Sequence, residues 1–209
     1  MAQRSARAHT LATGSEVQLQ QFPSIRASAV RDALTFLDDF EHGAQRRVLE
    51  QVPAASRSVI ESTPGTSWIS IEHDHYTVDA IIDLFGRERA ICYWRDLVAT
   101  LVNRPLLSGF VSNLIRLLGR EPVSVVRGFA KAWPLVYRDL CEPQLIATSD
   151  GQPTIRFANL ASELRRYPNY LDSWYGACQG FAHIAQVRGH VQFEVASDRS
   201  WAEAKFFWE

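Results

Sequence analysis

The chain has 209 residues, of which 46% are apolar and 22% are charged, a composition typical of globular proteins. Its 22 basic and 23 acidic side chains nearly cancel, so it lacks the positive charge with which nucleic-acid-binding domains contact phosphates. No apolar run approaches the ~20 residues of a membrane-spanning helix. Composition therefore argues against nucleic acid as a partner and against a membrane span.

The three cysteines, Cys92, Cys141 and Cys178, are far apart in the sequence and form no Cys-x-x-Cys pair. A disulfide framework or a zinc knuckle needs paired spacing, so we expect free thiols in a reducing compartment. No apolar run follows the basic residues Arg4 and Arg7, as it would in a signal peptide. These features predict a cytoplasmic protein.

The first 20 residues are small and polar and predict a flexible N-terminal arm, followed by one α+β domain over residues 21–209. Apolar side chains recur at helical spacing in segments 24–40, 78–85, 91–101, 106–117, 125–140 and 171–185. Ser24 is expected to cap the first helix, and Gly43 is expected to stop it.

The remaining segments predict strands. Residues 145–148 and 154–159 are β-prone and flank an Asp-Gly turn, which is a strong hairpin signal. Residues 191–195 and 204–208 alternate between apolar and polar side chains, as half-buried strands do. The predicted fold class is α+β, a helical bundle packed on a small antiparallel sheet.

Glu72, His73, Asp74 and His75 form the densest run of potential metal ligands. On a strand the two histidines would share a face, whereas on a helix they would diverge by ~200° and could not reach one zinc ion. The flanking pattern favours a helix start, with the acidic side chains as a solvated cap at the positive end of the helix dipole. We therefore predict no metal site, and a metal-dependent enzyme ranks third among the functions considered.

The chain also lacks the common catalytic motifs. There is no Gly-x-Ser-x-Gly elbow, no Walker loop and no Gly-x-Gly-x-x-Gly fingerprint. Cys178 and His183 would be rotated ~140° apart on one helix, so they do not form a nucleophile and base pair. We predict no catalytic residue, and the sequence favours binding over catalysis.

Aromatic residues are abundant, with 6 Trp, 6 Tyr and 11 Phe. Trp and Tyr combine an apolar body with a polar tip and can orient a ligand in a pocket. Trp94, Trp133, Tyr137, Trp174 and Cys178 are therefore the predicted ligand-binding residues of a non-enzymatic small-molecule-binding or sensory module. The alternative is that these side chains only fill the core. A cavity of ~300 Å³ or more, lined by the helix aromatics, would favour the ligand-binding module over a pure interaction protein.

The C-terminal strand points to an interface. Phe206 and Trp208 share one face, so Phe207 must lie on the other, together with Trp201. Exposed aromatic surface is uncommon on a monomer, and Trp201 and Phe207 are therefore predicted to form a homodimer contact, unless another part of the chain covers them. A homodimeric adaptor without a ligand is the second function considered.

Several short motifs together resemble an uncharacterised family of roughly 200-residue bacterial proteins known chiefly from myxobacterial genomes. They are Arg47-Val48-Leu49, Val52-Pro53, Ser67-Trp68, Gly86-Arg87, Gly176-x-x-x-Gly180, Gly189 and Ala204-x-Phe206-x-Trp208.

That family is distantly similar to heme–nitric-oxide-binding domains and 4-vinyl-reductase-type ligand domains. The resemblance implies a helical bundle against an antiparallel sheet that holds a small hydrophobic ligand or dimerises. The heme-binding branch carries a Tyr-x-Ser-x-Arg signature, which is absent here. Heme is therefore disfavoured and no cofactor is expected.

Overall fold

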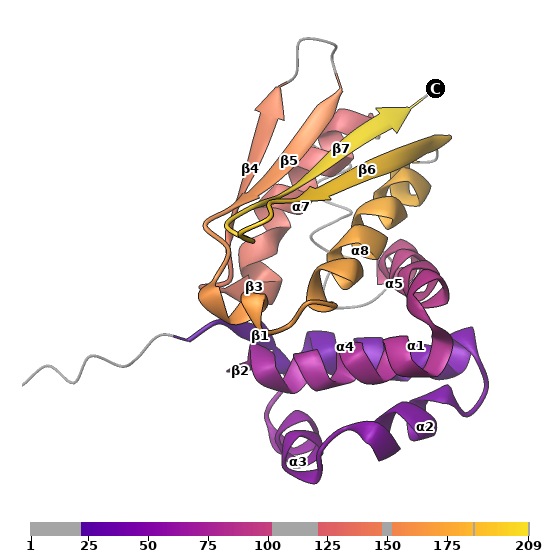
Figure 1. Cartoon of the computed structure of the whole chain (residues 1–209). Helices are drawn as coiled ribbons and strands as arrows, with labels where there is room; N and C mark the ends of the chain where they lie inside the picture. Colours follow the sequence, from indigo (N-terminus) through magenta and orange to yellow (C-terminus); the bar gives the residue numbers. More distant parts are fainter. Residues whose placement is uncertain (1–21, 102–120, 148–151, 186, 209) are drawn as a thin grey trace, which may run out of the picture.

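The computed structural model describes residues 22–101, 121–147, 152–185 and 187–208 (Figure 1). Its elements follow in the order β1 Ser24–Arg26, α1 Ala27–Phe40, α2 Ala44–Gln51, α3 Ala54–Ser62, β2 Trp68–Ser70, α4 Ile71–Phe85, α5 Arg87–Leu101, α7 Pro122–Val136, β3 Tyr137–Arg138, β4 Glu142–Ala147, β5 Pro153–Ala158, the 3₁₀ turn η1 Ser162–Arg165, α8 Tyr170–Ala185, β6 Gly189–Val195 and β7 Ala202–Trp208. The α+β prediction is confirmed.

Helices α1 to α4 form a layer at one end of the molecule (Figure 1). Gly43 has a φ of +74°, a conformation that glycine adopts without strain, and it separates the end of α1 from the start of α2. Helix α5 then leads out of this layer toward α8 (Figure 1).

A small antiparallel sheet in the order β2-β1-β3 joins this layer to the end of α7. Ile25 on β1 pairs with Ile69 on one side and with Tyr137 on the other. The prediction that Ser24 caps the first helix is wrong, because Ser24 lies in β1 and α1 begins at Ala27. Strands of two or three residues are too short to show a period in the sequence, and their partners lie far along the chain.

The second sheet has the order β4-β5-β7-β6 and is antiparallel throughout. The predicted hairpin is confirmed, because Leu145 on β4 pairs with Ile155 on β5; its turn lies outside the described residues. Helices α7 and α8 cover one face of this sheet (Figure 1). Phe206 is fully buried on that side, whereas Phe207 keeps accessible surface, as the alternation predicts.

Helices α5 and α8 approach each other closely. A Cβ atom added to Gly176 would lie 2.5 Å from the Ile91 carbonyl oxygen, and one added to Gly180 would lie 2.7 Å from the Arg95 carbonyl oxygen. Two glycines four residues apart lie on one helix face, so the Gly176-x-x-x-Gly180 motif allows this contact. It places α8 between the N-terminal layer and the four-stranded sheet.

Some predictions fall on residues that the structure does not describe. The N-terminal arm at residues 1–20 and the helix at residues 106–117 are among them. Within the described ranges, no helix combines the length and the apolar character needed to cross a membrane.

Candidate ligand-binding site

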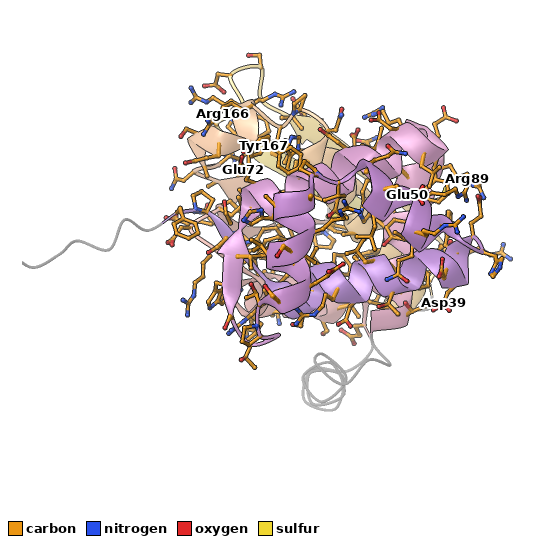
Figure 2. The ribbon with its side chains drawn as sticks, turned by 90° about the horizontal axis from the view of Figure 1, so that it is seen from below. Asp39, Glu50, Glu72, Arg89, Arg166 and Tyr167 are labelled. Atoms are coloured by element: carbon orange, nitrogen blue, oxygen red, sulfur yellow. The ribbon has the colours of Figure 1, made fainter. Side chains whose placement is uncertain are left out.

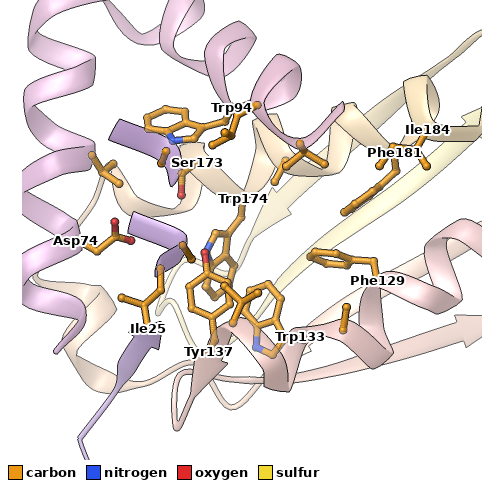
Figure 3. Close-up of a pocket in the computed structure, with 18 of the residues that line it drawn as sticks. Ile25, Asp74, Trp94, Phe129, Trp133, Tyr137, Ser173, Trp174, Phe181 and Ile184 are labelled. Atoms are coloured by element: carbon orange, nitrogen blue, oxygen red, sulfur yellow. The ribbon is translucent and has the colours of Figure 1, made fainter. Parts of the chain in front are cut away.

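A cavity of about 190 Å³ lies between the N-terminal helices and the pair α7 and α8 (Figure 3). It is lined mainly by apolar side chains, with a few polar groups. The lining residues are Ile25, Ala29, Ala33, Asp74, Thr77, Val78, Ile81, Trp94, Leu97, Val98, Val125, Gly128, Phe129, Ala132, Trp133, Val136, Tyr137, Ser173, Trp174, Ala177, Phe181 and Ile184.

Trp133 is the centre of the aromatic packing on one wall. Its ring centroid lies 4.3 Å from that of Tyr137, 4.7 Å from that of Trp174 and 5.2 Å from that of Phe157. Phe129 precedes Trp133 by one helical turn, so both rings lie on the same face of α7. This face of α7 therefore packs against both α8 and the four-stranded sheet.

The structure brings four of the five predicted ligand-binding residues together. Trp94, Trp133, Tyr137 and Trp174 line the cavity from α5, α7, β3 and α8 (Figure 3). Tyr137 was expected inside a helix, but α7 ends at Val136 and Tyr137 starts β3.

Cys178, the fifth residue, does not belong to the lining. It lies one turn after Trp174 on α8 and is fully buried in the core. Burial raises the pKa of its thiol, so the group stays protonated and inert. The prediction that Cys178 contacts the ligand is therefore corrected. Cys178 lies on the apolar stripe of α8 and packs in the core.

Polar groups gather at one end of the cavity. Asp74 on α4 is 8% exposed, and the hydroxyl group of Tyr170 on α8 donates a hydrogen bond to its Oδ2 atom. Ser173 Oγ lines the cavity beside them and donates to the Tyr170 carbonyl oxygen, 2.6 Å away. Figure 3 shows Asp74 and Ser173 at this end and Phe129, Phe181 and Ile184 at the other. The cavity therefore has a polar end and an apolar end.

Burial changes the acidity of these groups. It raises the pKa of Asp74 to about 6, and the hydrogen bond from Tyr170 lowers that pKa by a smaller amount. Burial, and next the nearby charge of Asp74, raise the pKa of Tyr137 and of Tyr170. The two phenols therefore remain protonated, and Asp74 is the group at this end whose charge changes near neutral pH.

Sequence reasoning missed the role of Asp74, which was expected to be a solvated helix cap. A signal was present, because Asp74 continues the apolar stripe of Val78, Ile81 and Phe85 by one turn toward the start of α4. An acidic residue on the buried stripe of a helix lies against the core. Its hydrogen-bond donor, Tyr170, lies 96 residues away in the sequence.

The two histidines of the same segment have separate partners. The predicted helix start is confirmed, with Ser70 Oγ accepting a hydrogen bond from the Glu72 amide, 3.3 Å away. His73 Nδ1 lies 3.0 Å from Ser56 Oγ, whereas His75 Nε2 lies 3.2 Å from an oxygen of Asp79.

His75 also stacks on the ring of Tyr167, whose centroid is 3.8 Å away. Figure 2 shows Tyr167 beside Glu72 on this face of the molecule. Within the ranges that the structure describes, no three acidic, His or Cys side chains are arranged to hold a metal ion.

The predicted interface residues lie away from the cavity, on the outer face of the four-stranded sheet. Both keep some accessible surface. The Arg156 guanidinium lies 4.7 Å from the Trp201 ring, while Phe207 stacks on His190 and has the Lys205 ammonium 5.2 Å from its ring. Long side chains of the same sheet thus cover part of both rings.

No protein-family model matches the chain, and no curated protein matches it. The myxobacterial resemblance therefore has no support from these comparisons.

Among solved structures, two point variants of the H-NOX domain, one titled Tt H-NOX and the other from T. tengcongensis, share the fold with a TM-score of 0.50 each. Both are 12% identical in sequence; they match 88% of this chain and 95% and 97% of their own lengths. The chain has the fold of these domains.

This likeness corrects one expectation. The sequence argued for no cofactor and against heme, whereas the structural neighbours are H-NOX domains, the heme–nitric-oxide-binding group, so that expectation is withdrawn.

We therefore tested the described lining for a heme fit. It contains no His, Cys or Met, and its one phenol, Tyr137, has a raised pKa that opposes the phenolate needed as an iron ligand. The volume of about 190 Å³ is also below the ~300 Å³ at which pockets for larger ligands begin. In the arrangement that the structure shows, the described lining therefore does not fit a heme.

Proposed function

We propose that this chain is a small-molecule-binding sensory domain whose ligand occupies the cavity between the N-terminal helices and α7 and α8. The supporting observation is the mainly apolar cavity of about 190 Å³, with a polar end at Asp74 and an apolar end at Phe181. The H-NOX fold of the chain agrees with this proposal, because those domains bind small molecules. The proposal assigns no chemical reaction to the site.

The size of the cavity limits the ligand. An apolar cavity of ~150 Å³ in a protein interior is large enough to bind benzene. A volume of about 190 Å³ therefore suits one substituted ring or a molecule of similar size. The cavity does not reach the ~300 Å³ that was expected of a ligand pocket, so the proposal is restricted to a ligand smaller than a typical drug.

Ligand binding would be transmitted through the walls of the cavity. Helices α1, α4 and α5 form one side, and α7 and α8 form the other. A ligand that contacts both sides changes their relative arrangement if it fits one arrangement better than another. The small β2-β1-β3 sheet, which contributes Ile25 to the lining, connects the two sides.

The proposal that the cavity binds a small apolar molecule is tested by titrating the isotope-labelled full chain with ethylbenzene and monitoring the titration by NMR. Resonances of lining residues such as Val125 and Ile184 should shift and saturate. Replacing Ala132, a small lining residue on α7, by Leu should abolish binding because the new side chain fills the cavity. The matched control is Ala130→Leu, on the same helix but outside the lining, which should bind as the wild type does. Binding that is unchanged in Ala132→Leu, or absent from the wild type, would refute the proposal.

Heme is the second candidate ligand, because the matched solved structures are H-NOX domains. It would require the cavity to widen. Titration with hemin tests this candidate: a stoichiometric Soret band that survives gel filtration, and that Ala132→Leu removes, would establish heme in this cavity. If hemin separates from the protein during gel filtration, heme is excluded and the smaller apolar ligand remains the proposed occupant of the cavity.

We also propose a homodimeric, cytoplasmic protein. The outer sheet face with Trp201 and Phe207 is the proposed contact, since both rings keep accessible surface. The cytoplasmic location is supported by Cys92, Cys141 and Cys178, which are free thiols.

A further inference from the structure

Strand β6 forms one edge of the four-stranded sheet, and its outer side has no neighbouring strand among the described residues. Figure 1 shows it with β7 on one side and with α8 close to it. The strand is seven residues long. The opposite edge strand, β4, carries Pro143, which hinders further pairing because proline has no N–H, whereas β6 contains no proline. The β6 edge is therefore the one that is open to an added strand.

The pairing with β7 determines which backbone groups of β6 point to the open side. The Ala196 amide donates a hydrogen bond to the Trp201 carbonyl oxygen, 3.0 Å away. Hydrogen-bonded and non-hydrogen-bonded pairs alternate along an antiparallel ladder, so the backbone of Gln192 bonds to β7, while the N–H and C=O groups of Val191 and Phe193 point away from it. Within the described part of the chain, those outward groups have no hydrogen-bond partner.

A groove runs along the open side of β6, between this strand and α8. It consists of two hollows of about 500 and 490 Å³, which meet at Tyr175 on α8 and Val191 on β6. The Tyr175 ring stacks on Phe193, with 5.6 Å between the ring centroids. Because side chains alternate along a strand, a peptide strand added to β6 would place every second side chain over this groove.

The groove is basic. Asp172 is its one acidic lining residue, and it is already paired with Arg87, 2.8 Å away. Arg188 is exposed and forms no ion pair with a described residue. The positive charge near Arg188 is therefore available to an acidic partner. The basic lining residues are Arg87, Arg95, His183, Arg188, His190 and Arg199.

The chain itself supplies no acidic segment that matches this groove. Outside the described residues, the first 21 positions contain Arg4 and Arg7 with a single acid, Glu16, and residues 102–120 contain three arginines and no acid. The β6 strand of a second copy would bring one acid, Glu194, together with the same basic neighbours. Like charges repel, so a segment of a different, acidic protein complements the groove best.

We infer that the β6 edge binds an extended, acidic segment of a partner protein, which adds a strand to the sheet and places acidic side chains beside Arg188. Hydrogen bonds to the backbone of Val191 and Phe193 provide affinity, and alternate side chains in the groove provide specificity, as in other domains that bind peptides at a sheet edge. The inference goes beyond the proposed function, because it concerns how the domain contacts a partner and does not depend on what occupies the cavity.

Fluorescence anisotropy of labelled peptides with the full chain tests the recognition. A short peptide of alternating Glu and Val should bind and saturate. Its counterpart with Lys in place of Glu should bind about 10-fold more weakly or not at all, because it repels the basic groove. Equal binding of the two peptides would overturn the acidic partner.

Backbone methylation distinguishes strand addition from simple charge attraction. One version of the acidic peptide is N-methylated at every Glu, and the other at every Val, so both keep the charge. Only one of these alternate sets of N–H groups can face β6. One version should therefore lose binding while the other keeps it. Equal binding of both versions would overturn strand addition.

A charge reversal in the protein assigns the preference to the groove. Arg188→Glu should weaken binding of the acidic peptide about 10-fold or more, because it puts a like charge beside the peptide. The matched control is Arg127→Glu, which changes an exposed arginine on α7 outside the groove and should bind as the wild type does. Unchanged binding in Arg188→Glu would overturn the proposed position of the acidic side chains.

Amide hydrogen exchange, measured by NMR, locates the added strand. In the free protein the amides of Val191 and Phe193 should exchange faster than that of Gln192, and the acidic peptide should slow the exchange of the first two only. Protection of these two amides in the free protein that disappears on dilution would show a second copy at the edge. Protection that is independent of concentration would show that the chain covers the edge itself. Either result would overturn the inference.

Discussion

The hydroxyl group of Tyr170 at the start of α8 donates a hydrogen bond to the carboxyl group of Asp74 in the first turn of α4. The contact links the N-terminal helical layer to the helix that carries Trp174. It also buries an acid, and burial raises the pKa of Asp74 to about 6 from 3.8. The stability of the protein should therefore depend on pH.

The direction follows from proton linkage. The folded state holds the Asp74 proton more tightly than the unfolded state, so the free energy of unfolding should fall as pH rises from about 4 to about 6 and stay lower above that. The full effect is about 3 kcal/mol. Asp74→Asn should lose this component and be more stable than wild type near pH 7. Urea unfolding across this range measures it, with Asp83→Asn as the control; an unchanged slope in Asp74→Asn would refute the assignment.

Replacing Gly176 by Ala should destabilise the protein by about 1–3 kcal/mol or more, because the new methyl group meets the Ile91 carbonyl oxygen at 2.5 Å. Alanine favours a helix by only about 1 kcal/mol over glycine, so the clash dominates. Gly65→Ala is the milder control, since the nearest neighbour of its new methyl group, at 3.0 Å, is the end of the Arg31 side chain and not backbone. Thermal unfolding measures both, and equal midpoints for the two variants would contradict the close packing of α5 and α8.

His75→Ala should cost about 1 kcal/mol of stability, because it removes the stack on Tyr167 and the contact with Asp79. His73→Ala should cost less, since it removes one hydrogen bond, to Ser56. Chemical denaturation compares the two variants. A stoichiometric metal in the wild type that both variants lose would instead place a metal at this segment.

The double replacement Trp201→Ser with Phe207→Ser tests the proposed dimer. Both rings keep accessible surface on the outer sheet face, so the variant should stay folded and sediment as a monomer where the wild type sediments as a dimer. Gln192→Ser, on the edge strand β6 of the same sheet, is the control and should not change the sedimentation. A wild type that sediments as a monomer would remove the dimer proposal.

Local patterns in the sequence determined most of the secondary structure. The Val78, Ile81 and Phe85 stripe predicts α4, and the Asp-Gly hairpin predicts the pairing of β4 with β5. Both signals act over a few residues, because hydrophobic periodicity and turn residues determine the local backbone conformation. The same short-range alternation placed Phe206 inside the sheet and Phe207 outside.

The aromatic content also identified the side chains of the candidate site, since Trp94, Trp133, Tyr137 and Trp174 all line the cavity. Amphipathic spacing places such residues on the buried face of a helix. It cannot distinguish a ring that lines a cavity from one that fills the core, and Cys178 illustrates this limit.

The tertiary structure alone decided the polar end of the cavity. The partner of Asp74 lies 96 residues away, and β1 pairs with strands about 40 and 110 residues distant. Contacts of this range depend on how helices and sheets pack, and no local pattern encodes them. The contact of the Trp174 indole with the Tyr137 hydroxyl group is likewise a property of the packed cavity, because it joins α8 to the strand that follows α7.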